Sequence, residues 1–284
     1  MKPNISEFSY GYALTEELAK SFGSSITASP VFPSLYEEGK KGGGWDVKLE
    51  KGGIPLFLQF KLSHYLKNAN AKERISGNFL SPYYRMHIRP INHSKQHELL
   101  LELERLGNEV YYSAPGFHEP KELNDAYLTN KVKNKSIWVK PTDIGDITDT
   151  DEHYLAFQLP TTWFFCSKPK PIERNLSFSV FQENIISALY QRKETALTRN
   201  SLIELANSLE SIGKKRKDIH MEDEHRITGI KTLIDGENIK AISPEWPPID
   251  NSAIIKETFS NRHPIELVSY YSSMYLDSQL VIVQ

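Results

Sequence analysis

The amino-acid sequence predicts a mixed α/β protein, and three observations lead to this fold class. Apolar residues recur at helical spacing in some segments, and they alternate or run continuously in others. The two kinds of segment are interspersed along the chain. Over residues 6–113 the predicted order is helix, strand, strand, strand, helix, strand. This order indicates a mixed sheet flanked by helices, because a repeated βαβ unit would alternate strictly.

The first predicted elements come from the amino-terminal third of the chain. Residues 6–22 have helical spacing, and Ser6 is the expected N-cap. A loop rich in Ser, Pro and Gly follows and closes with glycines 42–44. Three strands are predicted next, over residues 45–50, 54–63 and 83–89. The second, IPLFLQFKLS, is almost continuously apolar, which is typical of a central strand buried on both faces.

The middle of the chain supplies the next elements. A leucine stripe predicts a helix over residues 94–106, and Gly107 is the expected residue after its end. The remaining elements are a strand over 109–113, a short helix over 121–129, and strands over 136–139 and 153–159.

The character of the sequence changes at the KPKP stretch, residues 168–171, which resembles a linker. We therefore divide the chain into a core of residues 1–170 and a mostly helical C-terminal extension of residues 171–284. Helices are predicted over 178–195 and 199–212, and the chain ends in a strand-like LVIVQ. Oligomerisation and the binding of a partner protein or DNA are the roles that we consider for this extension.

Composition limits the functions that are possible. The 34 Lys and Arg residues balance 36 Asp and Glu residues, so the net charge of −2 excludes a uniformly basic nucleic-acid coat but not a local basic groove. The single cysteine, Cys166, excludes an intramolecular disulfide and a cysteine-based zinc site. A lone thiol, the lack of a secretory signal and the lack of a membrane-length apolar run predict a cytoplasmic protein that does not enter membranes.

Polar residues interrupt or flank two of the predicted strands. Gln59 and Lys61 are two residues apart in one strand and so share a face. The turn at Gly52-Gly53 makes the preceding strand antiparallel, which brings Asp46 toward Gln59. Burying the Lys61 ammonium without a partner is costly, so we expect it to face a partner or an anionic ligand.

This trio is suited to phosphodiester hydrolysis. Carboxylate and amide oxygens are ligands that Mg²⁺ prefers, so Asp46 and Gln59 are candidate metal ligands. The ion polarises a phosphate oxygen and lowers the pKa of a bound water. Lys61 can orient that water and stabilise the negative charge of the transition state. The sequence therefore predicts a Mg²⁺-dependent hydrolase in which Mn²⁺ can substitute.

These residues resemble the motifs of the PD-(D/E)XK nuclease superfamily, over about the first 160 residues. Asp46 in GWDVKL matches the hairpin Asp of the second motif, and Gln59-Phe60-Lys61 matches the third motif in its QxK form, which has one anionic ligand fewer. The resemblance implies a restriction-endonuclease-like core, with an α-β-β-β-α-β mixed sheet flanked by helices. It also implies a metal-dependent DNA endonuclease, with a role in prokaryotic defence against phages and plasmids.

The resemblance also implies further site residues. A Glu on the opening helix completes the metal site in this superfamily, so Glu7 is our first choice and Glu17 the second. Glu38, in the loop before Asp46, is the third choice. Related nucleases often place a Gln on the helix after the third strand, and Gln96 occupies that element. We expect Gln96 to help position the substrate or a metal-bound water.

A basic strand face is the candidate DNA contact. Arg85, His87 and Arg89 alternate along the strand of residues 83–89, which indicates either phosphate contacts or a solvated face of a half-buried strand. Because the net charge is near zero, we expect a homodimer or a partner protein to concentrate positive charge at the DNA. The alternative function is a catalytically silent, nucleic-acid-binding or scaffolding subunit of a defence complex, since Gln59 stands where an acid is usual.

Overall fold

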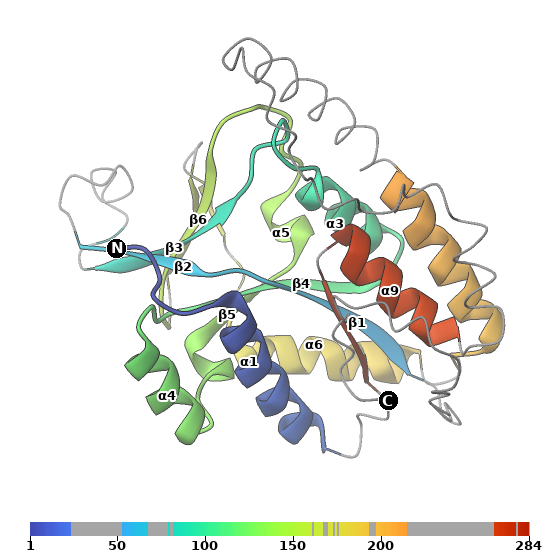
Figure 1. Ribbon diagram of the computed structural model, residues 1–284, viewed down its shortest axis with the longest axis horizontal. Helices are drawn as coiled ribbons and strands as arrows, with labels where there is room; N and C mark the ends of the chain where they lie inside the picture. Colours follow the sequence, from blue (N-terminus) through green and yellow to red (C-terminus); the bar gives the residue numbers. More distant parts are fainter. Residues whose placement is uncertain are drawn as a thin grey trace, which may run out of the picture.

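The computed structural model describes residues 1–23, 53–67, 79, 82–160, 162–166, 170–172, 174, 176–192, 197–214, 264–276 and 278–283. Within them the chain builds a four-stranded sheet, a five-stranded sheet and helices that cover the first sheet on both faces (Figure 1). The α/β class that the sequence predicts is thus confirmed. The predicted strand over residues 45–50 and the glycines 42–44 lie outside the described residues.

The four-stranded sheet, which we call the core sheet, has the strand order β5-β4-β1-β9. Its strands are β1 (Ile54–Phe60), β4 (Glu109–Pro115), β5 (Ser136–Val139) and β9 (Gln279–Val283). β1 and β4 are parallel, whereas β5 and β9 run antiparallel to their neighbours. Every residue of these strands is buried, as the continuous apolar run of β1 predicts for a strand covered on both faces.

The final strand joins the two halves of the sequence. β9 pairs with β1, and Val281 lies opposite Leu56 in the register. Residues beyond 171 therefore complete the sheet whose first strand begins at residue 54, and they contribute side chains to both large hydrophobic clusters.

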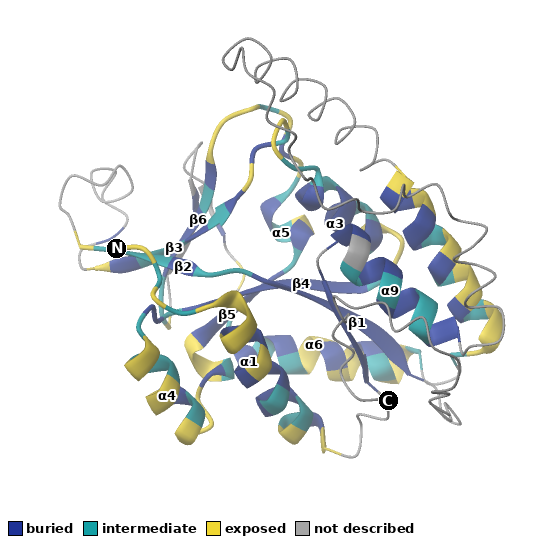
Figure 2. Ribbon diagram, in the orientation of Figure 1, coloured by how far each residue is buried: buried dark blue, intermediate teal, exposed yellow. Residues whose placement is uncertain are grey.

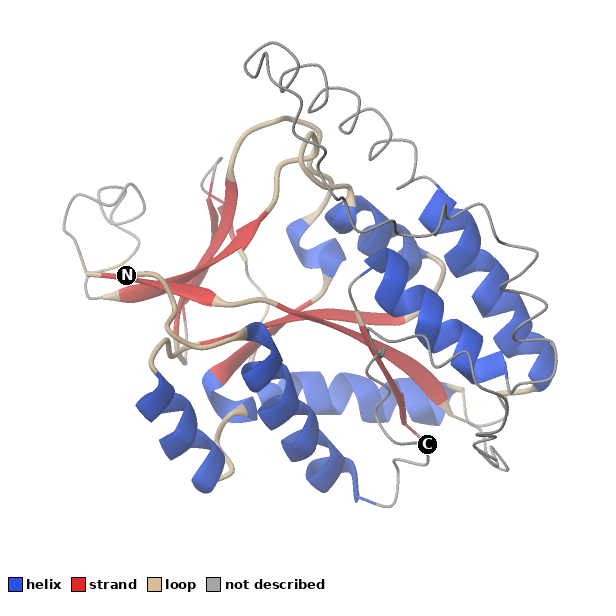
Figure 3. Ribbon diagram, in the orientation of Figure 1, coloured by secondary structure: helices blue, strands red, loops and turns tan. Residues whose placement is uncertain are grey.

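Helices cover the two faces of the core sheet (Figures 1 and 3). On one face lie α1 (Glu7–Phe22), α4 (Pro120–Leu128) and α6 (Phe178–Gln191), and the short 3-10 turn η2 (Lys133–Lys135) precedes β5. On the other face lie α3 (Gln96–Arg105), α5 (Pro141–Ile144), a helix over residues 199–214 and α9 (Pro264–Leu276). No helix in these described segments combines the length and the apolar character that crossing a bilayer requires.

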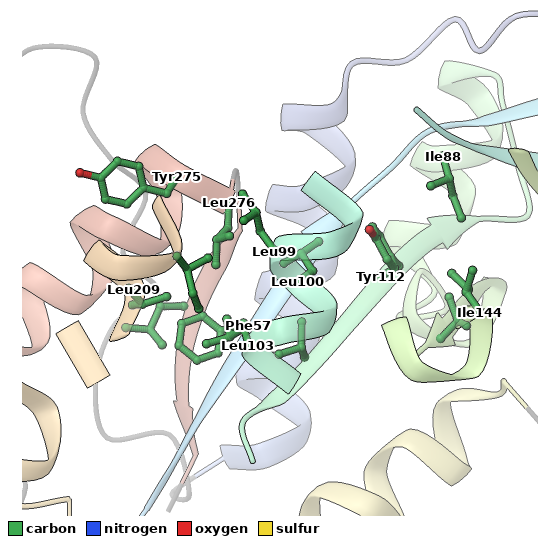
Figure 4. Close-up of a cluster of buried hydrophobic side chains, with 14 of the residues drawn as sticks. Phe57, Ile88, Leu99, Leu100, Leu103, Tyr112, Ile144, Leu209, Tyr275 and Leu276 are labelled. Carbon is green, nitrogen blue, oxygen red and sulfur yellow. The ribbon is translucent and has the colours of Figure 1, made fainter. Parts of the chain in front are cut away.

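The face of α3 and α9 encloses the larger hydrophobic cluster (Figure 4). Phe57 of β1 packs there with the leucine stripe of α3, which includes Leu100 and Leu103, and with Leu276 of α9. Burying side chains of this size stabilises the fold by about 1.5–3 kcal/mol each. This packing sets the position of α3 relative to the end of β1.

The opposite face begins with α1, and its sequence explains how it sits on the sheet. Ser6 caps the helix as predicted, because its hydroxyl accepts a hydrogen bond of 3.0 Å from the Ser9 backbone N–H. Gly11 allows a close approach to β1, since a Cβ atom at this position would lie 2.6 Å from the ring of Phe60. The side chain of Phe60 therefore points toward α1, away from α3.

The five-stranded sheet, which we call the second sheet, is antiparallel throughout. Its order is β2 (Ser63–Leu66), β3 (Tyr83–Ile88), β6 (His153–Gln158), β7 (Thr162–Cys166) and β8 (Lys170–Pro171). β2 follows β1 after only Lys61 and Leu62, so the single strand predicted over residues 54–63 is divided between two sheets. The prediction was wrong in this respect, because a continuous apolar run carries no signal for a change of pairing partner.

Candidate active site

Gln59 and Lys61 lie where β1 leaves the core sheet. Gln59 is the penultimate residue of β1, and its side chain is on the face of Phe57, toward α3. Lys61 follows the strand, and its backbone N–H donates to the carbonyl oxygen of Ser113 in β4 at 3.0 Å. Gln59 is 1% exposed, whereas Lys61 is half-buried.

Gln96 connects these two side chains from the first residue of α3. Its Oε1 accepts a hydrogen bond of 2.7 Å from the Lys61 Nζ, and its Nε2 donates to the Oε1 of Gln59 at 2.9 Å. The same Nε2 donates to the carbonyl oxygen of Leu276 in α9 at 3.1 Å. The expectation that the Lys61 ammonium needs a partner is confirmed, since the amide oxygen of Gln96 supplies one.

The next residue of α3 fixes the start of that helix. The Nε2 of His97 donates to the carbonyl oxygen of Gly145 at 2.8 Å, and its Nδ1 accepts from the Tyr112 hydroxyl at 3.2 Å. Burial lowers the pKa of His97, so the ring is neutral and one nitrogen can accept. Because His97 is held on both sides, the backbone at the start of α3, which carries Gln96, is fixed relative to β4 and α5.

The amide of Gln59 is oriented by a second hydrogen bond. Its Nε2 donates to the carbonyl oxygen of Phe60 at 3.0 Å, so its Oε1 turns toward Gln96. An amide oxygen has two lone pairs, and the bond from Gln96 uses one of them. The arrangement thus presents an oxygen ligand and an ammonium side by side, which is a fitting pair for a cation and a phosphate.

The two Glu candidates on the opening helix occupy different environments. Glu7 lies in the exposed first turn of α1, the helix that packs on the face of the core sheet opposite Gln59. Glu17 is 1% exposed, and its two oxygens accept the backbone N–H groups of Val132 at 2.9 Å and Lys133 at 3.0 Å. The carboxylate of Glu17 therefore ties α1 to η2, away from the group around Gln96.

Asp46 and Glu38, the other predicted acids, lie outside the described residues. In the part of the chain that the structure describes, no group of three His, Cys, Asp or Glu side chains is placed to hold a metal ion. Metal binding by Asp46 and Glu7 therefore stays a prediction from the sequence.

The predicted DNA-contacting residues separate into two places. Arg85 and His87 lie in β3 with their side chains turned away from the large hydrophobic cluster, and Arg89 is exposed just after the strand. Gln96, which we expect to help position the substrate, is 7% exposed and lies with Gln59 and Lys61. The contact with Leu276 had no signal in the sequence, since 180 residues separate the two partners.

Known proteins give no independent identification of this site. Comparison of the chain with protein-family models, with curated proteins and with solved structures gives no match.

Proposed function

We propose that this chain is a metal-dependent DNA endonuclease with a PD-(D/E)XK-like, restriction-endonuclease-like core. The observation that supports the proposal best is the convergence of Gln59, Lys61 and Gln96, within hydrogen-bond distance, at the end of a buried strand. The amide oxygen of Gln59 and the ammonium of Lys61 are both bonded to the amide of Gln96 on α3. The three side chains form a compact polar group beside a hydrophobic core.

The donor set fits a hard cation such as Mg²⁺ or Mn²⁺. Gln59 contributes a neutral oxygen that is oriented before any ligand binds, which is the type of ligand that these ions prefer. Asp46 is the carboxylate that we propose to complete the set, because Glu7 lies on the helix that packs on the opposite face of the core sheet. When bound, the metal would polarise a phosphate oxygen and make a bound water more acidic.

The residues of the chain have distinct roles in this proposal. Lys61 presents its ammonium to the phosphate that is cut, where it stabilises the negative charge that develops in the transition state. Gln96 acts through Lys61 and Gln59 as a positioning residue, because it bonds to both and is anchored to Leu276. The proposed setting is prokaryotic genome defence in the cytoplasm, with a homodimer or a partner protein completing the DNA cleft.

The test is DNA cleavage by the purified chain in Mg²⁺ or Mn²⁺. The Lys61→Met variant should cut a plasmid about 10²–10³-fold more slowly than wild type, the loss typical of removing one transition-state donor. The matched control is Lys121→Met, because Lys121 is an exposed lysine of α4 that pairs with Asp125. If wild type does not cut DNA, or if Lys61→Met cuts as fast as the control, the proposal is wrong.

A second candidate function is a silent, nucleic-acid-binding subunit, and the same hydrogen bonds favour it. Gln96 satisfies the Gln59 oxygen and the Lys61 ammonium with protein atoms, as a purely structural network would. Calorimetric titration with Mg²⁺ separates the two functions. A nuclease should show a binding heat that Asp46→Asn abolishes, whereas a silent subunit should show no heat that depends on Asp46.

A further inference from the structure

The second sheet has a face turned away from the large hydrophobic cluster, and we call it the outer face. Its half-buried part is formed by His64 of β2, Arg85 and His87 of β3, and Tyr154 of β6, whereas Tyr83 and Ala156 on the same face are buried in a small cluster with Phe79. In the register, His64 lies opposite Arg85 and His87 lies opposite Tyr154, so these side chains project from the same side of the sheet. The alternate residues of β3, such as Met86, point into the cluster.

The side chains of the outer face hold one another in place. The Arg85 guanidinium lies over the Tyr154 ring, 4.1 Å from its centroid, and the His87 ring centroid is 5.1 Å from the same ring. His87 also contacts the carboxylate of Glu152 and remains 38% exposed. Cations that are positioned before binding lose less side-chain entropy when an anion binds.

Positive charge gathers on this face although the chain as a whole is close to neutral. Residue 2 is held at the edge of β2, because the Tyr65 backbone N–H donates to the Met1 carbonyl oxygen at 2.9 Å. The pKa of His64 is lowered first by burial and then by the charge of Arg85, with His87 and Lys2 acting in the same direction. These neighbours create a local positive potential that favours an anion, and the carboxylate of Glu152 beside His87 offsets part of it.

The outer face lies close to the candidate active site. His64 follows Lys61 by three residues, so at most about 10 Å of chain separates the outer face from the candidate active site.

We propose that the outer face of the second sheet binds the phosphate backbone of DNA, with Arg85 and Lys2 as charged contacts and His64 as a hydrogen-bond donor. The inference rests on the proposed function in that it names the surface that holds the same substrate. The ring of Tyr154 keeps the Arg85 guanidinium in place for this contact.

The test is the binding of a fluorescein-labelled DNA duplex to the full chain in EDTA, followed by anisotropy over a range of salt concentrations. Each phosphate contact contributes about 0.9 to the slope of log affinity against log salt. Arg85→Gln should weaken binding to unrelated duplex sequences equally and lower that slope by about 1, whereas Arg85→Lys should keep it. The matched control is Arg105→Gln, because Arg105 is an exposed arginine of α3 that pairs with Asp146.

Lys2→Gln keeps the test valid if Arg85→Gln fails to fold, because Lys2 is exposed and its loss should weaken binding without disturbing the sheet. If Lys2→Gln and every folded Arg85 variant bind as wild type does, the outer face does not hold DNA. Equal affinity for polyglutamate, with the same loss in Arg85→Gln, would also overturn the assignment and indicate an acidic polypeptide as the partner.

The outcome is independent of cleavage. Binding in EDTA that depends on Arg85 or Lys2, together with no cleavage in Mg²⁺, would support the outer face and reject the nuclease. Cleavage that depends on Lys61, together with binding that is unchanged in both outer-face variants, would support the nuclease and reject the outer face.

Discussion

The two sheets of this molecule are buried in different ways, although β1 passes directly into β2. All strands of the core sheet are buried along their length, whereas β2 and β3 keep half-buried positions (Figure 2). A strand that is covered on both faces holds a polar side chain such as Gln59 in one place. A strand with half-buried positions on one face can offer charge to a partner. In our proposals, the chemistry takes place at the end of the core sheet and the second sheet binds the DNA.

The largest effect should come from the core sheet. Phe57→Ala removes a fully buried ring that packs against α3, so the free energy of unfolding should fall by about 3–5 kcal/mol. Tyr154→Ala, on the outer face of the second sheet, should cost about 1 kcal/mol or less. Urea denaturation measures the free energy of unfolding of both variants. Equal losses would mean that the two sheets do not differ in how their side chains are buried.

Gln96→Leu should give the next largest effect, because it removes the amide that joins α3, β1 and α9. The oxygens of Gln59 and Leu276 would lose a donor in a buried place, at a cost of about 1–3 kcal/mol in the free energy of unfolding. Gln96→Glu keeps an acceptor for Lys61, so cleavage should suffer less than in Gln96→Leu. The control is Gln191→Leu, at an exposed position of α6. If the two variants had the same free energy of unfolding, Gln96 would not link α3, β1 and α9.

The smallest effect concerns pH. Burial lowers the pKa of His97 in the folded state, so the stability that neutral His97 contributes is present above the unfolded pKa of about 6.5 and is lost as the pH falls below it. The slope from this one group is at most about 1.4 kcal/mol per pH unit. Urea denaturation between neutral and acidic pH should show a flatter profile for His97→Gln, and an unchanged profile would mean that His97 carries no such linkage. Some slope should remain, because the pKa of His64 is also lowered.

Local sequence patterns were sufficient for elements whose pattern is set by their own side chains. The predicted strand over residues 136–139 has the bounds of β5, and the leucine stripe placed α3 within two residues at its start and one at its end. The same stripe predicted the helix that carries Gln96, whereas the bond from Gln96 to Lys61 was not predicted. These successes share a cause, since periodicity and end signals are local.

Other features depend on contacts between distant parts of the chain. Two such contacts are the pairing of β9 with β1 and the bond from Gln96 to Leu276. Neither could be predicted without knowing where the last residues of the chain lie in the fold. Glu17 was a candidate metal ligand because it is an acid on the opening helix. In the structure its carboxylate accepts hydrogen bonds from backbone N–H groups at η2. A single sequence cannot distinguish a buried carboxylate that bonds to backbone N–H groups from one that binds metal, because both are acids in an apolar helix.

Our proposal that the end of the core sheet carries out the chemistry can be tested by the single-turnover rate of DNA cleavage in Mg²⁺ at saturating protein, for wild type, Lys61→Met and the Lys121→Met control. Lys61→Met should lower this rate constant by about 10²–10³-fold and leave the Kd for the same duplex in EDTA unchanged. Equal rate constants for the three proteins, or a loss that appears only in the Kd, would contradict it.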